Sequence, residues 1–427
     1  MGFDPYNSIQ TFDWRQNAWS LILIFDSFFL NLYTKRDSRQ YGRIFRHTFF
    51  FGKSLTGGAG FLLDSCKVCE TNRQVPRAML VSNPAAAKGG GHGLDQIRSA
   101  LRKGPPMTLC LCRRSAAEYL REAGARGWRL APLRRRNLPR LVPCASEVER
   151  LRNESGGFLT DPVHLLVADA SERRLVKDAL CHAAPARTLP RFVLETPSGL
   201  LVEGPGLCLL HAACELPLSC VAELAYEFCG NYRLRSDSRG FADCDPLTSR
   251  LELVRFAEAI GNAKGSRRLG RVLAYVRDGS RSPMETVIVL LLCLPPRLGG
   301  YGLPMPLLNH RVDVGRNGRK TSSNKYYVCD AFWREAWLDV EYDSDLAHTG
   351  PLRIAKDAKR RNGLASLGVT VITVTKEQAF NCDEMDRIAH AVAKKLRWRL
   401  HVGGSEWVKA RAGLRRELLF HGNVQVA

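Results

Sequence analysis

The sequence predicts an α/β protein whose C-terminal part is a mixed sheet flanked by helices and is preceded by a mixed α+β region. Three observations favour this fold. Residues 282–375 alternate between helical and extended patterns. Acidic side chains stand late on two neighbouring extended runs of this stretch. Of the 427 residues, 45% are hydrophobic, which is enough for a sizeable core.

The length suggests two or three domains, and shifts in composition indicate where they meet. We expect a poorly ordered extension and linker over residues 1–94, followed by the mixed α+β region over 95–250. The domain built on the mixed sheet then covers residues 251–400, and 401–427 form a C-terminal tail.

Residues 1–94 show no coherent folding pattern. The apolar run Trp19–Tyr33 contains Asp26 and is shorter than the ~20 residues that span a bilayer. Acidic residues precede this run, unlike the cationic start of a signal peptide. The Gly-rich stretch 83–94 is typical of a linker. We therefore expect no stable membrane association, and a membrane anchor is the alternative interpretation.

The 14 cysteines are scattered along the chain, often inside apolar runs such as 207–210. Without a convincing signal peptide, this usage indicates reduced, buried thiols in a cytoplasmic protein. Cys66 and Cys69 form an isolated Cys-x-x-Cys pair. No second pair follows at zinc spacing, so a structural zinc site is the weaker interpretation of these two residues.

Residues 95–250 alternate between short extended runs and apolar helices. We expect strands over 107–112, 163–167, 192–194 and 199–202, and helices over 115–124, 175–183, 205–216 and 218–230. The two long apolar helices carry no obvious catalytic group. Their Leu- and Cys-rich faces are typical of a core.

This middle part resembles the C-terminal region of AbiEi-type abortive-infection antitoxin proteins. The resemblance rests on Arg173-Arg174, Cys181-His182, the Leu-Pro-x-Phe turn at 189–192, and the Gly-x-x-Val-x-x-Pro segment that leads into an apolar helix (199–213). AbiEi proteins usually begin with a winged helix, and no clear winged helix-turn-helix precedes this region. The resemblance implies a DNA-binding antitoxin or transcriptional regulator that has a cognate toxin.

Two basic segments flank the start of the C-terminal domain. Arg267, Arg268 and Arg271 cluster on one side of a predicted helix, 264–277. Arg319 and Lys320 belong to a basic insert at 314–325. Such residues suit sequence-independent contacts with phosphates. A solvated helix face and a hairpin tip are the alternative interpretations.

Within the C-terminal domain, the stretch that carries the acids begins at Ser-Pro-Met-Glu-Thr, 282–286. It leads into an apolar helix, 287–294, and then into a Pro/Gly-rich loop and the basic insert. The sequence further predicts strands over 326–333, 337–343 and 369–375, and helices over 353–367, 383–397 and 406–419. Because Glu341 and Asp343 are two apart on a strand, they share a face, and Asp330 lies on the run before them. Oxygen-only ligand sets of this kind suit Mg²⁺ or Mn²⁺.

This block resembles the PD-(D/E)XK nucleases, in the group related to very-short-patch-repair endonucleases. The resemblance implies a restriction-endonuclease-like fold, with Glu285 as the helix acid and Asp330 and Glu341 as the strand acids. The run from Asp343 to His348 looks like the family's Glu-x-Asp-Gly-x-x-His variant with one extra residue. Asp343 stands where the family has lysine, and the candidates to replace that lysine are His348, Lys356 and Lys359.

The net charge of +21 and the pI near 9.7 favour a polyanionic partner, and nucleic acid fits best. The charge alone equally fits a ribosomal or membrane-surface role. We expect Arg360 and Arg361 to join the other basic residues on double-stranded DNA. The resulting hypothesis is a Mg²⁺-dependent endonuclease with Asp330, Glu341 and Asp343 as metal ligands. The alternative is a non-cleaving DNA-binding antitoxin or regulator.

Overall fold

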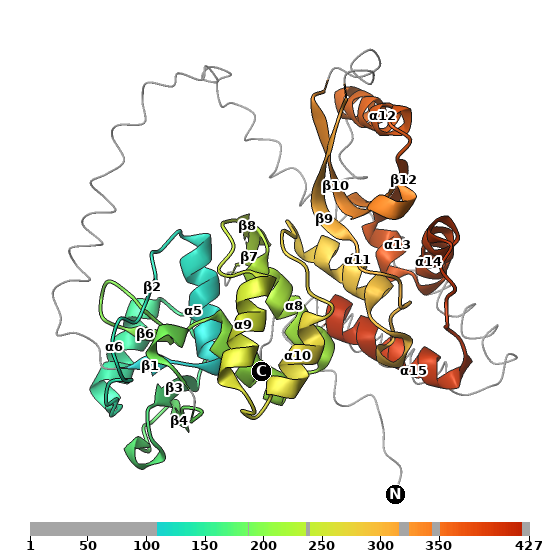
Figure 1. Cartoon of the computed structure of the whole chain (residues 1–427). Coiled ribbons are helices and arrows are strands. Elements are labelled where there is room, and N and C mark those ends of the chain that lie inside the picture. The colour runs from blue at the N-terminus through green and yellow to red at the C-terminus, as the bar shows by residue number, and fades with distance from the viewer. Residues whose placement is uncertain (1–108, 187, 236–239, 316–323, 344–350, 421–427) are drawn as a thin grey trace, which may run out of the picture. The chain divides into compact units, whose positions relative to one another are not determined.

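The computed structural model describes residues 109–420, apart from residue 187 and the segments 236–239, 316–323 and 344–350 (Figure 1). The chain divides into two units, Met1–Gly90 and Gly91–Ala427, and the described residues all belong to the second. The predicted extension and linker, with the apolar run Trp19–Tyr33 and the Cys66/Cys69 pair, lie outside the described residues.

A six-stranded mixed sheet organises the first part of the described chain. Its strand order is β2-β5-β6-β1-β3-β4, and the pairs β1/β6 and β3/β4 are parallel while the others are antiparallel. The strands are β1 (Cys110–Leu111), β2 (Ala131–Pro132), β3 (Val163–Val167), β4 (Ala179–Ala183), β5 (Val193–Glu195) and β6 (Leu201–Glu203). The helices α5 (Arg113–Ala125), α6 (Ala145–Ser155), α7 (Pro205–Glu215) and α8 (Leu218–Cys229) accompany them.

The expected helix over residues 175–183 is wrong. Residues 179–183 form the strand β4, which pairs in parallel with β3 and sets Cys181 opposite Leu165. Leu175, which contributed to the apolar helical pattern, is fully exposed in the preceding loop. A buried neighbouring strand offered hydrogen-bond partners that outweighed the local helical periodicity.

A hairpin and three helices connect the two larger sheets. The hairpin consists of β7 (Tyr232–Leu234) and β8 (Phe241–Asp243), and α9 (Arg250–Ile260), α10 (Ser266–Leu273) and α11 (Pro283–Cys293) follow. Ser282 caps α11, because its side chain accepts a hydrogen bond from the amide of Glu285 at 3.1 Å. Since α11 is buried almost throughout, its apolar sequence contacts protein on every side.

A four-stranded mixed sheet organises the second part, in the order β12-β11-β10-β9. Its strands are β9 (Leu307–Asp313), β10 (Tyr326–Trp333), β11 (Leu338–Asp343) and β12 (Thr370–Thr375), and α12 (Pro351–Ser366) connects the last two. The β9/β10 and β10/β11 pairs are antiparallel, whereas β11 and β12 are parallel. The chain therefore runs helix, three strands, helix, strand. The first of these strands, β9, lies where the sequence predicts a loop before the basic insert.

Different helices cover the two faces of this sheet. Ala331, Trp333 and Val340 belong to the main core together with the apolar residues of α11. On the other face, Tyr327 and Cys329 pack with Leu364 of α12. The sheet therefore lies between α11 and α12, in the mixed α/β arrangement that the sequence predicts.

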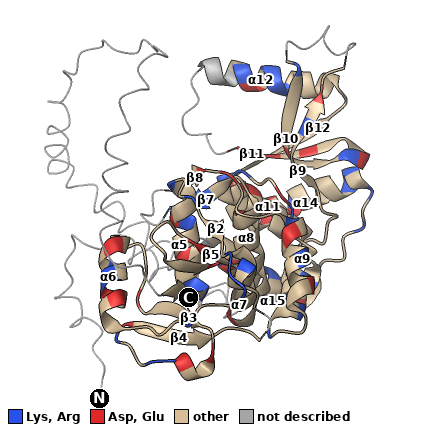
Figure 2. Cartoon of the chain, turned by 60° about the vertical axis from the view of Figure 1, so that its left-hand side comes forward, with Lys and Arg blue, Asp and Glu red and all other residues tan. Residues whose placement is uncertain are grey.

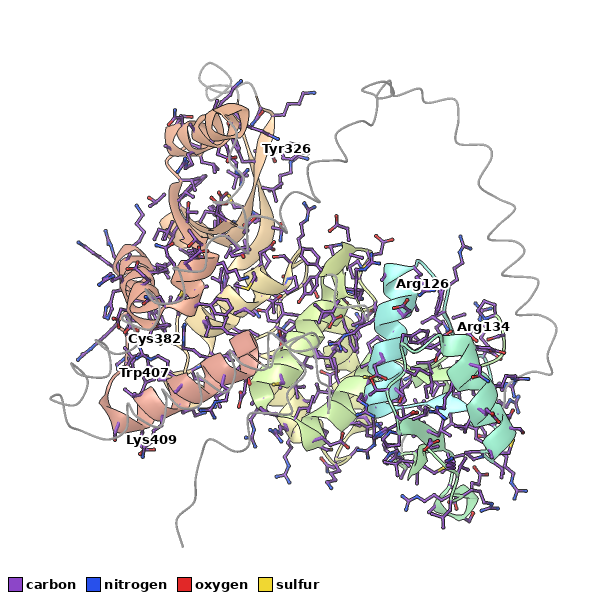
Figure 3. The ribbon with its side chains drawn as sticks, turned by 180° about the vertical axis from the view of Figure 1, so that it is seen from behind. Arg126, Arg134, Tyr326, Cys382, Trp407 and Lys409 are labelled. Carbon is purple, nitrogen blue, oxygen red and sulfur yellow. The ribbon has the colours of Figure 1, made fainter. Side chains whose placement is uncertain are left out.

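Three further helices complete the fold: α13 (Lys376–Phe380), α14 (Cys382–Leu396) and α15 (Gly404–Arg415). Trp407 on α15, labelled in Figure 3, donates from its ring nitrogen to the carbonyl of Gly300 at 3.1 Å. Arg411 binds Asp386 of α14 at 2.7 Å. The helix predicted over 406–419 within the expected C-terminal tail is therefore present as α15, and it packs against the rest of the fold. Across the described ranges, no helix has the length and apolar content needed to cross a membrane.

Candidate active site

Glu285 and Asp330 approach each other from α11 and β10. Glu285 lies in the first turn of α11, where its carboxylate accepts hydrogen bonds from the amide of Arg281 at 3.0 Å and from the Asn309 side chain at 2.8 Å. Asp330 lies in the middle of β10, and its Oδ2 accepts from the amide of Tyr342 at 3.1 Å. Both acids are therefore held by neighbouring elements.

A small cavity separates the two carboxylates. Its lining consists of Glu285, Ile288, Val289, Asp330, Ala331, Val340 and Tyr342. Its volume of about 10 Å³ is roughly what one water molecule or one ion requires. Because the rest of the wall is largely aliphatic, charges inside the cavity interact more strongly than they would in water.

The environment of Asp330 raises the pKa of its carboxyl to about 7. Burial is the largest cause, and the negative charges of Glu285 and Glu341 add to it. Near neutral pH the site therefore favours either a proton on Asp330 or a cation beside it. A carboxylate in a cleft with a strongly raised pKa is a typical mark of a functional position.

Carboxylates also replace part of the hydrogen bonding between β10 and β11. The strands pair regularly from Trp333 with Leu338 to Ala331 with Val340. The amide of Ala331, however, donates to Oδ1 of Asp339 at 3.3 Å, and the amide of Tyr342 donates to the carboxylate of Asp330. The two aspartates thus connect the strands at the edge of the cavity.

Asp339 was missed by the sequence reasoning. Its side chain is fully buried, and its pKa is raised by burial and by the adjacent Glu341. The signal was present, because the run Leu338–Asp343 places Asp339, Glu341 and Asp343 on one face of a strand. Asp339 stands near the start of the strand, and the sequence prediction considered only acids near strand ends.

Glu341 is held by α12. Its carboxylate forms an ion pair with Arg360, whose Nη2 also donates to the carbonyl of Val328 at 2.6 Å. Arg360, expected on the nucleic acid, is half-buried and connects α12 to both strands. Arg361, by contrast, is exposed.

The other predicted catalytic residues lie further along the same elements. Asp343 is the last residue of β11 and lies opposite Thr375 of β12. Its side chain is half-buried and interacts with another residue. Lys356 and Lys359 are exposed on α12. His348 lies outside the described residues, as do Arg319 and Lys320 of the basic insert.

The structure brings together fewer candidate ligands for a divalent cation than the sequence predicts. Within the ranges that the structure describes, no three His, Cys, Asp or Glu side chains are grouped to hold a metal ion. Asp330, Glu341 and Asp343 therefore do not converge as one ligand set. Glu285 and Asp330 do share the cavity, and two carboxylates with water suffice for Mg²⁺ in many proteins.

The predicted basic cluster lies on α10. Arg267 and Arg271 are exposed, whereas Arg268 is half-buried and donates to the carbonyl of Leu216, just after α7, at 2.6 Å. These three arginines and Lys264 line a second cavity, which is treated below.

His182, part of the antitoxin-like middle segment, stacks against His164 with ring centroids 5.0 Å apart. The Nε2 of His182 lies 3.1 Å from the Nδ1 of His164. Burial is the largest cause that lowers the pKa of both rings to about 4, so the pair is neutral at pH 7. A neutral stacked pair between β3 and β4 acts as packing and gives no sign of catalysis.

Comparison with protein-family models found no match to this chain, and searches of the curated proteins and of the solved structures also found none.

Proposed function

We propose that the chain is a Mg²⁺- or Mn²⁺-dependent endonuclease that hydrolyses phosphodiester bonds of double-stranded DNA. The observation that carries this proposal is the pair of carboxylates, Glu285 and Asp330, on one small cavity in an aliphatic wall. The resemblance to the PD-(D/E)XK nucleases supports it. The order of a helix, three antiparallel strands, a helix and a parallel strand agrees with the mixed, helix-flanked sheet that this resemblance implies.

The electrostatics of Asp330 favour a bound cation. Burial contributes most to the raised pKa of its carboxyl, and the negative charges of Glu285 and Glu341 raise it further and attract a divalent ion. Glu285 and Asp330 would hold that ion, and Glu341 would join them once Arg360 released it. A bound Mg²⁺ supplies an activated water and stabilises charge on the phosphate.

The chain's own residues would perform the remaining tasks. Asp343 has no proton-donating ammonium group, so it cannot orient the attacking water as the family's lysine does. Lys356 and Lys359 are the exposed ammonium groups of the adjacent helix α12 and suit that role better. Figure 2 shows the basic residues of α12, of which Arg361 is exposed and suits a DNA phosphate contact.

A non-cleaving DNA-binding antitoxin or regulator, with a cognate toxin as partner, is the second candidate. One observation favours it: the ion pair with Arg360 neutralises Glu341 without any metal. An acid neutralised in this way no longer repels a bound phosphate, so DNA could be held without being cut. The AbiEi-like middle segment agrees with this candidate.

For both candidates we propose a cytoplasmic location. The cysteines within the described residues are all free, including the partly or fully exposed Cys144, Cys181 and Cys214. Free accessible thiols suit a reducing compartment.

Plasmid nicking tests the two candidates against each other. Purified full-length protein would be incubated with supercoiled plasmid in Mg²⁺, Mn²⁺ or EDTA, beside the variants Asp330→Ala and Glu341→Ala. The matched control is Asp313→Ala, which removes an exposed carboxylate of the same sheet. The nuclease proposal expects metal-dependent nicking that is lost in both site variants and kept in the control. DNA binding without nicking, undiminished in the site variants, would establish the binder instead.

A further inference from the structure

A second cavity lies between α7 and the start of α10, and its lining contains none of the carboxylates described above. Its volume is about 860 Å³, within the range of small-molecule sites. Ala213, Cys214, Asn262 and Ala263 contribute to its wall, together with the first residues of α10. The space is therefore large enough for an organic ligand rather than for a single ion.

The cavity is strongly cationic. Lys264, Arg267, Arg268 and Arg271 all line it, and no acidic residue belongs to its lining as the structure describes it. Within the described ranges, none of these four side chains forms an ion pair. The cavity also opens on the first turn of α10, whose helix dipole adds partial positive charge.

This concentration of charge is unfavourable without a ligand. Arg267 and Arg271 are four residues apart on α10, where like charges destabilise a helix. An anion in the cavity would neutralise this repulsion, which is small because both side chains are exposed to water.

The cavity is shaped by packing rather than by loose side chains. Gly265 has a φ of +92°, and a Cβ on it would lie 2.6 Å from the carbonyl of Leu210 and 2.8 Å from Sγ of Cys214. The turn before α10 therefore fits closely against α7 only because it carries glycine. Arg268 is fixed by its 2.6 Å hydrogen bond to the carbonyl of Leu216. The wall and one of its cations are thus held in place before any ligand arrives.

We propose that this cavity binds an organic oligophosphate, such as a nucleoside di- or triphosphate. Four cations match the two to four negative charges of such a ligand, and Arg forms bidentate hydrogen bonds with phosphate. The methyl groups of Ala213 and Ala263 and the amide of Asn262 offer surface for its organic part. A DNA strand end carries the same phosphate chemistry, so the experiment must distinguish the two sources.

Calorimetric titration of the full chain, without divalent metal, tests this site independently of the carboxylates. The probes are inorganic tripolyphosphate, ADP, ATP and a 5′-phosphorylated single-stranded oligonucleotide. Arg267→Ala/Arg271→Ala removes two exposed cations, and Arg255→Ala on α9 removes one exposed cation outside the cavity. We expect binding of ATP and tripolyphosphate, at least tenfold weaker in the double variant and unchanged in Arg255→Ala.

Three results would overturn the proposal. The first is no binding of ATP or tripolyphosphate at low ionic strength. The second is equal weakening by Arg255→Ala, which would show a general charge effect. The third is binding of the oligonucleotide alone, which would assign the arginines to a nucleic-acid strand. Failure of the nuclease proposal would leave the nucleotide site standing, since the titration contains no metal and no cleavage step.

Discussion

Arg360 of α12 forms an ion pair with Glu341 of β11 and at the same time donates to the carbonyl of Val328 on β10. One guanidinium thus connects a helix to two strands at the level of Asp330. The Glu341 side chain is only 16% exposed, and Arg360 is the cation that pairs with it. Arg360 is therefore placed to control whether Glu341 is available to a cation.

Removing Arg360 should destabilise the protein through Glu341. Arg360→Met leaves a partly buried carboxylate without its ion-pair partner, and we expect a loss of ~1–2 kcal/mol in the free energy of unfolding. Urea denaturation at pH 7.5 measures it. Glu341→Gln should recover much of this loss in the double variant. Equal losses in the single and double variants would show that Arg360 acts through packing alone.

Asp330 should make stability depend on pH. Its carboxyl has a pKa of about 7 in the fold, above the ordinary value of about 3.9. The folded state therefore binds the proton more tightly, and this contribution is complete below pH ~4 and lost as pH rises through 7. Asp330→Asn has no carboxyl to deprotonate, so its stability does not fall in this way. Relative to wild type, its free energy of unfolding should therefore rise by ~1–2 kcal/mol between pH 5 and 8.

Thermal unfolding across this pH range measures the difference, with Asp313→Asn as the exposed control on the same sheet. A divalent cation added at pH 8 should stabilise wild type and leave Asp330→Asn unchanged. A difference between Asp330→Asn and wild type that stays constant from pH 5 to 8 would contradict the raised pKa.

Asp339 should be required for pairing of β10 with β11. Asp339→Ala leaves the buried amide of Ala331 without its side-chain acceptor, and ~1–3 kcal/mol of stability should be lost. Asp339→Asn keeps an acceptor oxygen and should lose less. Amide hydrogen exchange at Ala331 should be faster in the alanine variant than the loss of global stability alone accounts for. Unchanged exchange there would show that the strands are held by other contacts.

Gly363 should tolerate no side chain. A Cβ at this position of α12 would lie 1.9 Å from the hydroxyl oxygen of Tyr327, so Gly363→Ala must displace either the buried Tyr327 ring or the helix. We expect a loss of ~1–3 kcal/mol. Gly413→Ala on α15 is the matched control, since its Cβ would meet nothing within 4 Å, and it should gain ~0.5–1 kcal/mol. A neutral Gly363→Ala in chemical denaturation would refute the close contact.

The elements with strong local signals were predictable. The β-branched and aromatic run Tyr326–Trp333 is a strand over the predicted range. The apolar helix predicted over 287–294 is present as α11, although it begins earlier, at Pro283. Leu307–Asp313 was missed because this edge strand is polar and partly exposed, and only its pairing with β10 makes it extended. The helix expected over 175–183 failed for the same reason, since β3 determines the conformation there.

The candidate site was predictable only in part. Strand periodicity placed Glu341 and Asp343 on one face, and the resemblance to the PD-(D/E)XK nucleases singled out Glu285 and Asp330. Contacts between distant segments decide the remainder. No local pattern shows that Arg360 binds Glu341, or that Glu285 and Asp330 share a cavity while Glu341 is held by α12.

The nuclease proposal requires first that Glu285 and Asp330 bind a divalent cation. Calorimetric titration of Mn²⁺ into the full chain at pH 8 measures this directly, beside Asp330→Asn, Glu285→Gln and the control Asp313→Asn. The proposal predicts one site in wild type and in the control, and at least tenfold weaker binding in each of the other two variants. Mn²⁺ affinity that is absent, or equal in all four proteins, would contradict it.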